Sequence, residues 1–120
     1  MPHPSAVVSI HPYFKVNPGK LEAVRALLPG FIERTATEPK NLYYDFTFNG
    51  DELFCREAYL GADGLLAHLE NVGTLLQEML RLTTLTRSEV HGSKAELDKL
   101  RDALADLKPA WFVFERGVAR

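Results

Sequence analysis

Apolar and polar residues alternate along the first part of the chain, from Ala6 to Val16. A period of two residues places successive side chains on opposite faces of a β-strand, and both faces here include apolar groups. Pro12 cannot donate a hydrogen bond to a neighbouring strand, so it predicts an edge position or a bulge. We therefore expect a first strand that is irregular near its middle.

The period lengthens after Asn17-Pro18-Gly19, where turn residues precede an apolar stripe with three- and four-residue spacing. The spacing predicts an amphipathic helix with Asn17 as its N-cap and Pro18 at its first position. Pro29-Gly30 should kink or divide this helix. The stripe consists of Leu21, Val24, Leu27, Leu28, Phe31 and Ile32.

Asn49-Gly50 is the strongest local signal in the chain, because it separates two alternating runs that are rich in aromatic residues. Asn-Gly favours the two-residue turns that join antiparallel strands. We expect residues 42–48 and 53–60 to pair as a hairpin, and Glu38-Pro39 to form the turn before it.

A helical period returns over residues 61–80, with Asp63 as the expected N-cap and an interruption at Gly73. The next run, residues 82–90, is rich in Thr, Val and Leu and predicts a fourth strand.

The last part of the chain predicts one more helix and one more strand. Ser93 and Glu96 have the spacing of a capping box, and Pro109 should end the helix that follows. Residues 111–114 then predict a short strand. The order β-α-β-β-α-β with an added α-β indicates one α+β domain over residues 1–120, with a ferredoxin-like antiparallel sheet and both main helices on one face.

Two helices on one face leave the opposite face of the sheet to be accounted for. The first strand places Val7, Ser9, His11 and Tyr13 there, which is a mixed rather than a polar set. A half-apolar surface of this kind usually marks a protein interface. We expect a homodimer that packs two sheets face to face, with the strand at 111–114 able to join the partner's sheet edge.

Charge and cysteine content exclude several classes of protein. The chain has 14 Lys and Arg against 16 Asp and Glu, and no concentrated basic run, which argues against nucleic acid or an anionic membrane as a partner. No stretch approaches the roughly 20 apolar residues that span a bilayer. The single Cys55 cannot form an internal disulfide, so we expect a buried thiol and a reducing cytoplasm.

A series of short motifs follows in order between Val8 and Leu76. They are Asn17-Pro18-Gly19-Lys20, Glu38-Pro39, Leu42 and Tyr44, Glu57 and Tyr59, and Asp63 through His68-Leu69. Together they resemble the antibiotic biosynthesis monooxygenase domain. The resemblance implies a dimeric α/β barrel with a pocket between sheet and helices. It also implies either oxygenation of polycyclic aromatic or quinol substrates without metal or flavin, or degradation of haem.

Three positions depart from the family pattern. Lys40 replaces the glycine that usually follows Glu-Pro, a change confined to the turn. Gly73 falls where a second histidine often lies in the second helix, and Pro12 falls where haem-degrading relatives have Asn. These departures disfavour haem as a cofactor.

His68 and Tyr44 are the first candidates for chemistry. Oxygenation without a cofactor requires a base, hydrogen bonds to the substrate anion and a dry pocket. A neutral His68 could be that base or an anchor, although a lone histidine is more often structural. Tyr44 could direct its hydroxyl into the pocket, or the hydroxyl could simply hydrogen-bond to some partner within the core.

Glu57 is a third candidate catalytic base. The alternative, and the more common role for such a residue, is an ordinary ion pair across the sheet. Its possible partners are Arg56, Arg87 and Lys15.

His11, Asp45 and Trp111 are candidates for substrate binding. His11 and Asp45 could form a pair on the second face of the sheet, where such a pair would raise the histidine pKa or fix the dimer register. Trp111 should anchor the last strand, or stack on an aromatic ligand. The four histidines are scattered and one Cys is too few for a zinc site, so no metal is expected.

The sequence therefore supports two hypotheses. The first is a cofactor-independent monooxygenase that uses molecular oxygen on a small aromatic, polyketide or quinol-type molecule. The alternative is a non-catalytic homodimer of the same fold with a ligand-binding or stress-related role. Converging polar groups in an enclosed cavity would favour the enzyme, and a space filled by side chains would favour the alternative.

Overall fold

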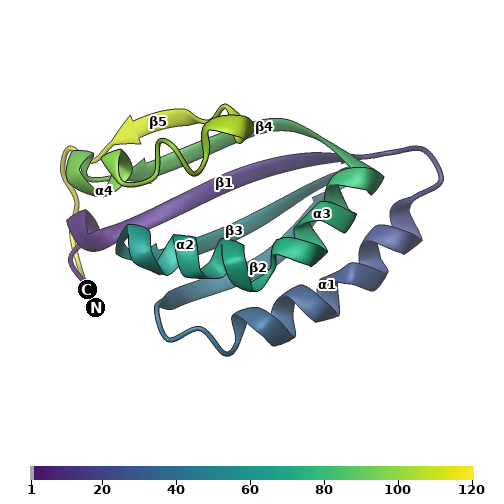
Figure 1. Cartoon of the computed structure of the whole chain (residues 1–120), viewed down its shortest axis with the longest axis horizontal. Helices are drawn as coiled ribbons and strands as arrows, with labels where there is room; N and C mark the ends of the chain where they lie inside the picture. Colours follow the sequence, from purple (N-terminus) through teal and green to yellow (C-terminus); the bar gives the residue numbers. More distant parts are fainter. Residues whose placement is uncertain (1) are drawn as a thin grey trace.

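The computed structural model describes residues 2–120 and contains one sheet with helices on one face (Figure 1). Its strand order is β2-β3-β1-β4-β5. The elements are β1 (Val7–Val16), α1 (Leu21–Thr35), β2 (Asn41–Asn49), β3 (Glu52–Leu60), α2 (Gly61–Asn71), α3 (Gly73–Leu82), β4 (Thr83–Gly92), α4 (Lys94–Asp98) and β5 (Ala110–Val113). The α+β ferredoxin-like fold is thereby confirmed. The four strands of the β-α-β-β-α-β unit pair antiparallel, as expected, and the added strand β5 runs parallel to β4.

β1 lies at the centre of the sheet, where it pairs antiparallel with both β3 and β4. The expectation that Pro12 marks an edge strand is therefore wrong. The other expectation, an irregularity, is confirmed. The pairing of β1 with β3 passes from Ile10 to Tyr13 without a partner for Pro12, and the register with β4 shifts between Tyr13 and Phe14. This local break accommodates the missing N–H.

α1 begins three residues later than the sequence predicts. Lys20 is the N-cap, and its N–H donates to the Asn17 carbonyl across a turn in which Gly19 has φ 77°. Asn17 is therefore not the cap. Pro29 lies inside one continuous helix. The burial of Val24 and Phe31 on either side of it holds the two halves against one core, so the expected division does not occur.

The predicted hairpin is confirmed. Asn49 pairs with Glu52, and Gly50 between them has φ 60°, a conformation that favours glycine.

α2 follows β3 directly and is capped by a residue from another element. Leu60 is the N-cap and offers no side-chain acceptor, so the expected Asp63 cap is wrong. Instead, Glu96 Oε1 accepts from the Ala62 N–H at 2.8 Å. Gly61 permits this approach, since it has φ 71° and a Cβ there would lie 2.8 Å from Glu96 Oε1. α2 and α3 are separate helices, and Gly73 begins the second, as the sequence predicts.

The C-terminal helix is shorter than its apolar spacing predicts. Ser93 Oγ accepts from the Glu96 N–H, which confirms the cap, but α4 ends at Asp98. The chain continues in turns that bury Leu100 and Leu104, so their contribution is to the core and not to a helix. In this structure β5 pairs with β4 of the same chain.

Candidate functional site

Glu57 is placed in the core by the alternation of β3. Residues 53, 55, 57 and 59 share the face covered by helices, and only 6% of Glu57 is exposed. The Tyr59 hydroxyl donates to Glu57 Oε1 at 2.6 Å. Burial raises the pKa of Glu57 to about 7, and the charge of Glu38 adds to this, whereas hydrogen bonds from Tyr59 and Cys55 act in the opposite direction. Glu57 is therefore part protonated at neutral pH.

His68 extends from α2 towards the same point and lies between two carboxyl groups. Its Nδ1 is 2.9 and 3.1 Å from the two oxygens of Glu38, and its Nε2 is 3.6 Å from Glu57 Oε1. Because Glu38 accepts, Nδ1 holds the proton of the neutral ring and Nε2 has a free lone pair. Burial lowers the pKa of His68, and this outweighs the opposing effect of Glu38.

Glu38, in the turn between α1 and β2, orients the histidine and was missed by the sequence analysis. Asn71 Nδ2 donates to Glu38 Oε2 at 2.8 Å and also to the Arg34 carbonyl at 2.8 Å, so the carboxylate is fixed from a second side. Glu38 and His68 are 30 residues apart in sequence, and no local spacing relates them.

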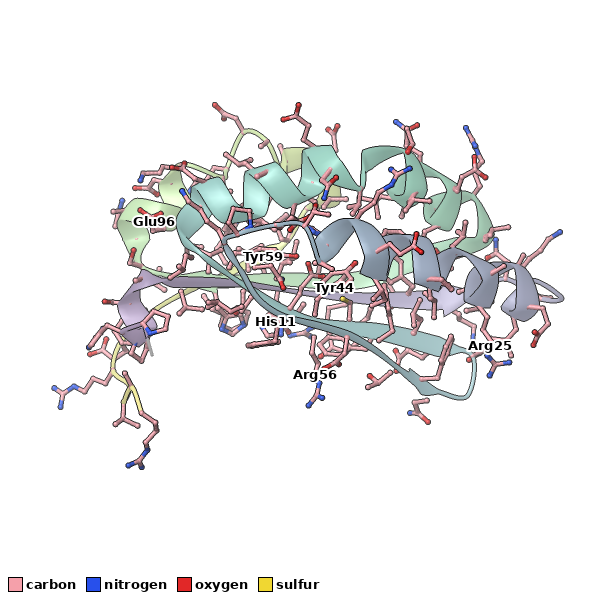
Figure 2. The ribbon with its side chains drawn as sticks, turned by 90° about the horizontal axis from the view of Figure 1, so that it is seen from below. His11, Arg25, Tyr44, Arg56, Tyr59 and Glu96 are labelled. Carbon is pink, nitrogen blue, oxygen red and sulfur yellow. The ribbon has the colours of Figure 1, made fainter. Side chains whose placement is uncertain are left out.

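Tyr44 and Cys55 complete the polar end of the site. The Tyr44 ring lies 5.0 Å from that of His68, and Figure 2 shows Tyr44 and Tyr59 between the sheet and the helices. Burial raises the pKa of the Tyr44 hydroxyl and of the Cys55 thiol, so both stay neutral. The expected buried thiol is confirmed, and Tyr44 can act only as a neutral hydrogen-bonding group.

An apolar cavity of about 50 Å³ lies against these groups. Tyr44, Cys55, Glu57, His68 and Ser88 form its polar part, and no Lys or Arg of residues 2–120 lines it. Aliphatic side chains of α3 and β4 form much of the remainder, including Met79 and Leu85. Such a space excludes bulk water from the histidine and the two carboxyl groups.

The proposed ion pairs of Glu57 do not occur. Its possible partners each pair elsewhere: Arg56 with Asp45, Arg87 with Glu89, and Lys15 with Asp51. These Arg and Lys side chains lie on the face of the sheet that the helices leave uncovered, here called the open face, or at its end. Glu57 points to the helices instead, so the interpretation of Glu57 as a partner in such an ion pair was wrong.

The three residues considered for substrate binding lie outside the cavity. Asp45 binds Arg56 with two hydrogen bonds and does not meet His11, whose ring instead lies 4.6 Å from that of His91. Trp111 packs beside the core under the Arg101 guanidinium, at 4.8 Å. A role for His11, Asp45 or Trp111 in binding stays a prediction.

The arrangement is suited to proton transfer. A neutral imidazole with a fixed tautomer can accept a proton at Nε2, and a carboxyl group with a pKa of about 7 lies 3.6 Å away to donate one. Over residues 2–120, no three His, Cys, Asp or Glu side chains gather in a way that could hold a metal ion. Nor does any helix in that range have the length and apolar character needed to cross a membrane.

Solved structures place the fold in a known class. Rv0793 from Mycobacterium tuberculosis is 26% identical and covers 70% of this chain and 91% of its own, with a TM-score of 0.64. A protein from Nitrosomonas europaea, provisionally named an antibiotic biosynthesis monooxygenase, is 18% identical, covers 78% and 96%, and has a TM-score of 0.67. The chain thus has the fold of the antibiotic biosynthesis monooxygenase-like family, as the resemblance predicted.

A further solved structure, that of MupZ, matches nearly the whole chain. MupZ from Pseudomonas fluorescens is 46% identical, covers 95% of this chain and 94% of its own, and superimposes with a TM-score of 0.89. At that identity the chain belongs to the same family as MupZ. No family model and no curated protein sequence matches the chain.

Proposed function

We propose that the chain is an enzyme that transfers protons on a small, largely apolar molecule, with His68 as base, Glu57 as acid and Glu38 as the residue that orients the base. The supporting observation is the position of His68 between two buried carboxyl groups at the edge of an apolar cavity. Proton transfer by positioned groups contributes about 10²- to 10⁴-fold to a rate.

In its specific form, the proposed reaction is oxygenation of an aromatic, polyketide or quinol-type substrate without a cofactor. His68 Nε2 removes a proton from an activated CH₂ group, and the resulting anion reduces molecular oxygen. One oxygen atom becomes the new carbonyl, the CH₂ group loses both hydrogens, and the second oxygen atom leaves as water after Glu57 donates a proton. The overall change is R₂CH₂ + O₂ → R₂CO + H₂O.

A second candidate is proton transfer without oxygen, such as an isomerisation. The observation that favours it is the acid–base pair itself, because a carboxyl group with a pKa of about 7 beside a free imidazole nitrogen can serve a redox-neutral reaction equally well. The small volume of the cavity, about 50 Å³, favours the third possibility, a non-catalytic ligand-binding protein, since it leaves little room for a substrate and oxygen together.

Oxygen uptake by the metal-free protein tests the first candidate against the others. With anthrone and a panel of quinols, we expect substrate-dependent uptake that falls at least about 100-fold in kcat/KM for His68→Gln and Glu57→Gln. Glu70→Gln, an exposed change on the same helix, is the matched control. Product that forms equally well without oxygen supports the redox-neutral reaction. Ligand binding without any product supports the non-catalytic protein.

The pH profile gives an independent test of the assigned roles. His68 must be deprotonated and Glu57 protonated in the active form. We expect kcat/KM to fall above about pH 7, where Glu57 ionises, and to fall again on acidification below the lowered pKa of His68. If Glu57→Gln loses the alkaline limb of the profile and keeps the acid limb, the alkaline limb is assigned to Glu57 and the acid limb to His68. A profile with no alkaline limb would contradict the role of Glu57.

We also propose that the chain works as a homodimer through the open face of the sheet. That face presents exposed apolar groups, including Tyr43 and Phe112, beside the Arg56–Asp45 and Arg87–Glu89 pairs. Because the charges on it are internally paired, a second copy with the same pattern can lie against it with little net repulsion.

A further inference from the structure

The cavity beside His68 extends across the sheet to an end that the proposed reaction does not use. Glu57 belongs to β3, whereas Leu85 and Ser88 belong to β4, and the central strand β1 lies between these two strands. Neighbouring strands lie about 4.8 Å apart, so this second end is about 10 Å from Glu57. It is called the β4 end of the cavity below.

The β4 end is closed by Leu107 and lies nearer to solvent than the polar end. Leu107 lines the cavity, and its carbonyl accepts from the Ser88 hydroxyl at 3.2 Å. Glu57 and His68 are 6% and 3% exposed. Leu107 and Leu85 are only half-buried. The part of the wall that faces solvent is therefore the part that contains Leu107.

A ring-containing molecule cannot enter the cavity unless its wall moves. The cavity has a volume of about 50 Å³, whereas an apolar cavity that binds benzene has about 150 Å³. The aromatic and quinol-type substrates proposed for this site contain at least one such ring. One element of the wall must therefore be displaced when the substrate binds.

Leu107 belongs to the smallest element of the wall. It ends η2 (Ala105–Leu107), one turn of 3₁₀-helix in which no residue is fully buried. Within residues 2–120, the Ser88–Leu107 bond is the only hydrogen bond that joins η2 to the sheet. Lys108, which follows, has a left-handed backbone with φ 48°, a conformation that is unfavourable for a residue with a Cβ. Displacement of η2 therefore breaks one hydrogen bond and exposes little buried surface.

We propose that the substrate enters the cavity beside Leu107 with its polar group first, and that Leu107 closes behind an apolar tail of the substrate. The Ser88–Leu107 hydrogen bond is the latch of this entrance, because it must break when η2 is displaced. Leu107 is then a specificity-determining residue, since the space in front of it sets the length of the tail.

The entrance deepens the proposed function by naming the substrate class, and it rests on His68 and Glu57 as the reacting end. The substrate should have a polar group at that end and an apolar tail that ends about 10 Å away, at β4. A charged tail is disfavoured, because no charged side chain of residues 2–120 lines the β4 end and a buried charge without a partner is costly.

Binding of 4-alkylphenols tests the role of Leu107 without requiring turnover. Titration calorimetry with tails of increasing length should give a Kd that falls about 4-fold per methylene, the value of one buried CH₂, until the tail reaches Leu107. Longer tails should bring no further gain. Leu107→Ala should extend the gain by about two methylenes, because it leaves space in the wall. Leu27→Ala is the matched control, since Leu27 is a half-buried leucine beside the core that does not line the cavity.

The rate of association tests the latch. Ser88→Ala removes the hydrogen bond to Leu107, so we expect 4-butylphenol to associate about 5-fold faster, the value of one neutral hydrogen bond. Trp111, the single tryptophan, packs against the same part of the core as Leu107 and supplies a fluorescence signal for stopped-flow measurement. Thr86→Ala is the matched control, because Thr86 also lies on β4 and donates to a carbonyl, that of Tyr13, at 3.2 Å.

The results separate the entrance from the proposed reaction. An unchanged tail-length limit in Leu107→Ala, or equal association rates for Ser88→Ala and Thr86→Ala, overturns the entrance, and the acid–base proposal is then still judged by the turnover of His68→Gln. A limit that depends on Leu107, in a protein without any turnover, supports the entrance and contradicts the proposed enzyme. If none of the alkylphenols binds, the entrance is refuted.

Discussion

The carboxyl group of Glu57 occupies a position that the alternation of β3 assigns to the core. Such a residue titrates at a different pH in the folded and the unfolded chain, because burial raises its pKa from 4.5 to about 7. The folded state then binds more protons between these values, so the contribution of Glu57 to stability falls as pH rises from about 4.5 to 7. His68 titrates in the opposite sense, since its pKa is lowered.

Glu57→Gln should therefore stabilise the protein at high pH and have little effect at low pH. Glutamine resembles the protonated acid and can still accept from Tyr59, so we expect a gain of up to about 3 kcal/mol at pH 8 and almost none at pH 4.5. Urea unfolding of both proteins at the two pH values measures this. Glu70→Gln, with an exposed carboxylate, is the control. An equal gain in the free energy of unfolding at both pH values would contradict a raised pKa of Glu57 in the folded protein.

His68 and Glu57 were identifiable as candidates from the sequence. Glu38, whose carboxylate accepts from His68 Nδ1, was not. A candidate base is recognisable from its type and its place in a periodic segment. The contact of Glu38 with His68 depends on how the turn after α1 meets the face of α2, and this is set by the packing of residues that lie 30 positions apart in the sequence.

At the scale of elements, short sequence signals predicted the structure correctly where that structure depends only on neighbouring residues. Asn49-Gly50 predicts its hairpin because the turn depends on the conformation of two residues. The expected cap at Asn17 failed because the chain makes a turn through Gly19 before α1 begins, and the one at Asp63 failed because Glu96 supplies the acceptor. The expected long helix after Ser93 stops at Asp98 because its leucines follow the core instead. Tertiary contacts outweigh propensities of this size.

The bond from Glu96 to α2 is a testable example of such a contact. Glu96 supplies the acceptor that Leu60 lacks, and it does so from the start of the C-terminal segment. Glu96→Ala should reduce the free energy of unfolding by about 1 kcal/mol, the usual value of a helix cap. Glu96→Gln should cost less, since it keeps an acceptor and loses only the charge near the positive end of the helix. Urea unfolding at pH 7 would measure both.

Lys99→Gln separates the cap from the Lys99–Glu96 ion pair, which is half exposed and should contribute little. Lys99 first and the Ala62 N–H second lower the pKa of Glu96, so stability from this group is lost as pH falls through that pKa. Because Glu96→Ala removes both contacts, a loss in Lys99→Gln as large as that in Glu96→Ala would show that the ion pair, and not the cap, holds the segment.

At the scale of the whole molecule, the helices bury one face of the sheet and leave the other with aromatic groups in solvent. Figure 2 shows Arg56 and His11 on the side away from the helices. On that face the rings of His11, His91 and Phe112 lie in a row. His11 meets His91 edge to face, with ring centres 4.6 Å apart, and His91 stacks on Phe112 at 4.5 Å. An ordered aromatic row on an uncovered sheet is the pattern expected of an interface core.

Tyr43→Glu tests whether a second copy covers this face. Tyr43 is 52% exposed, so the change should leave the fold intact, but it places an unpaired charge in the proposed interface. We expect wild-type protein to sediment at twice the 13.5 kDa mass of one chain, and the variant to dissociate with a Kd raised at least about 30-fold. Ile32→Glu, on the helical side at 44% exposure, is the matched control and should remain a dimer. A wild-type protein that sediments as a single chain at high concentration would refute the dimer, and equal weakening by both variants would place the contact elsewhere.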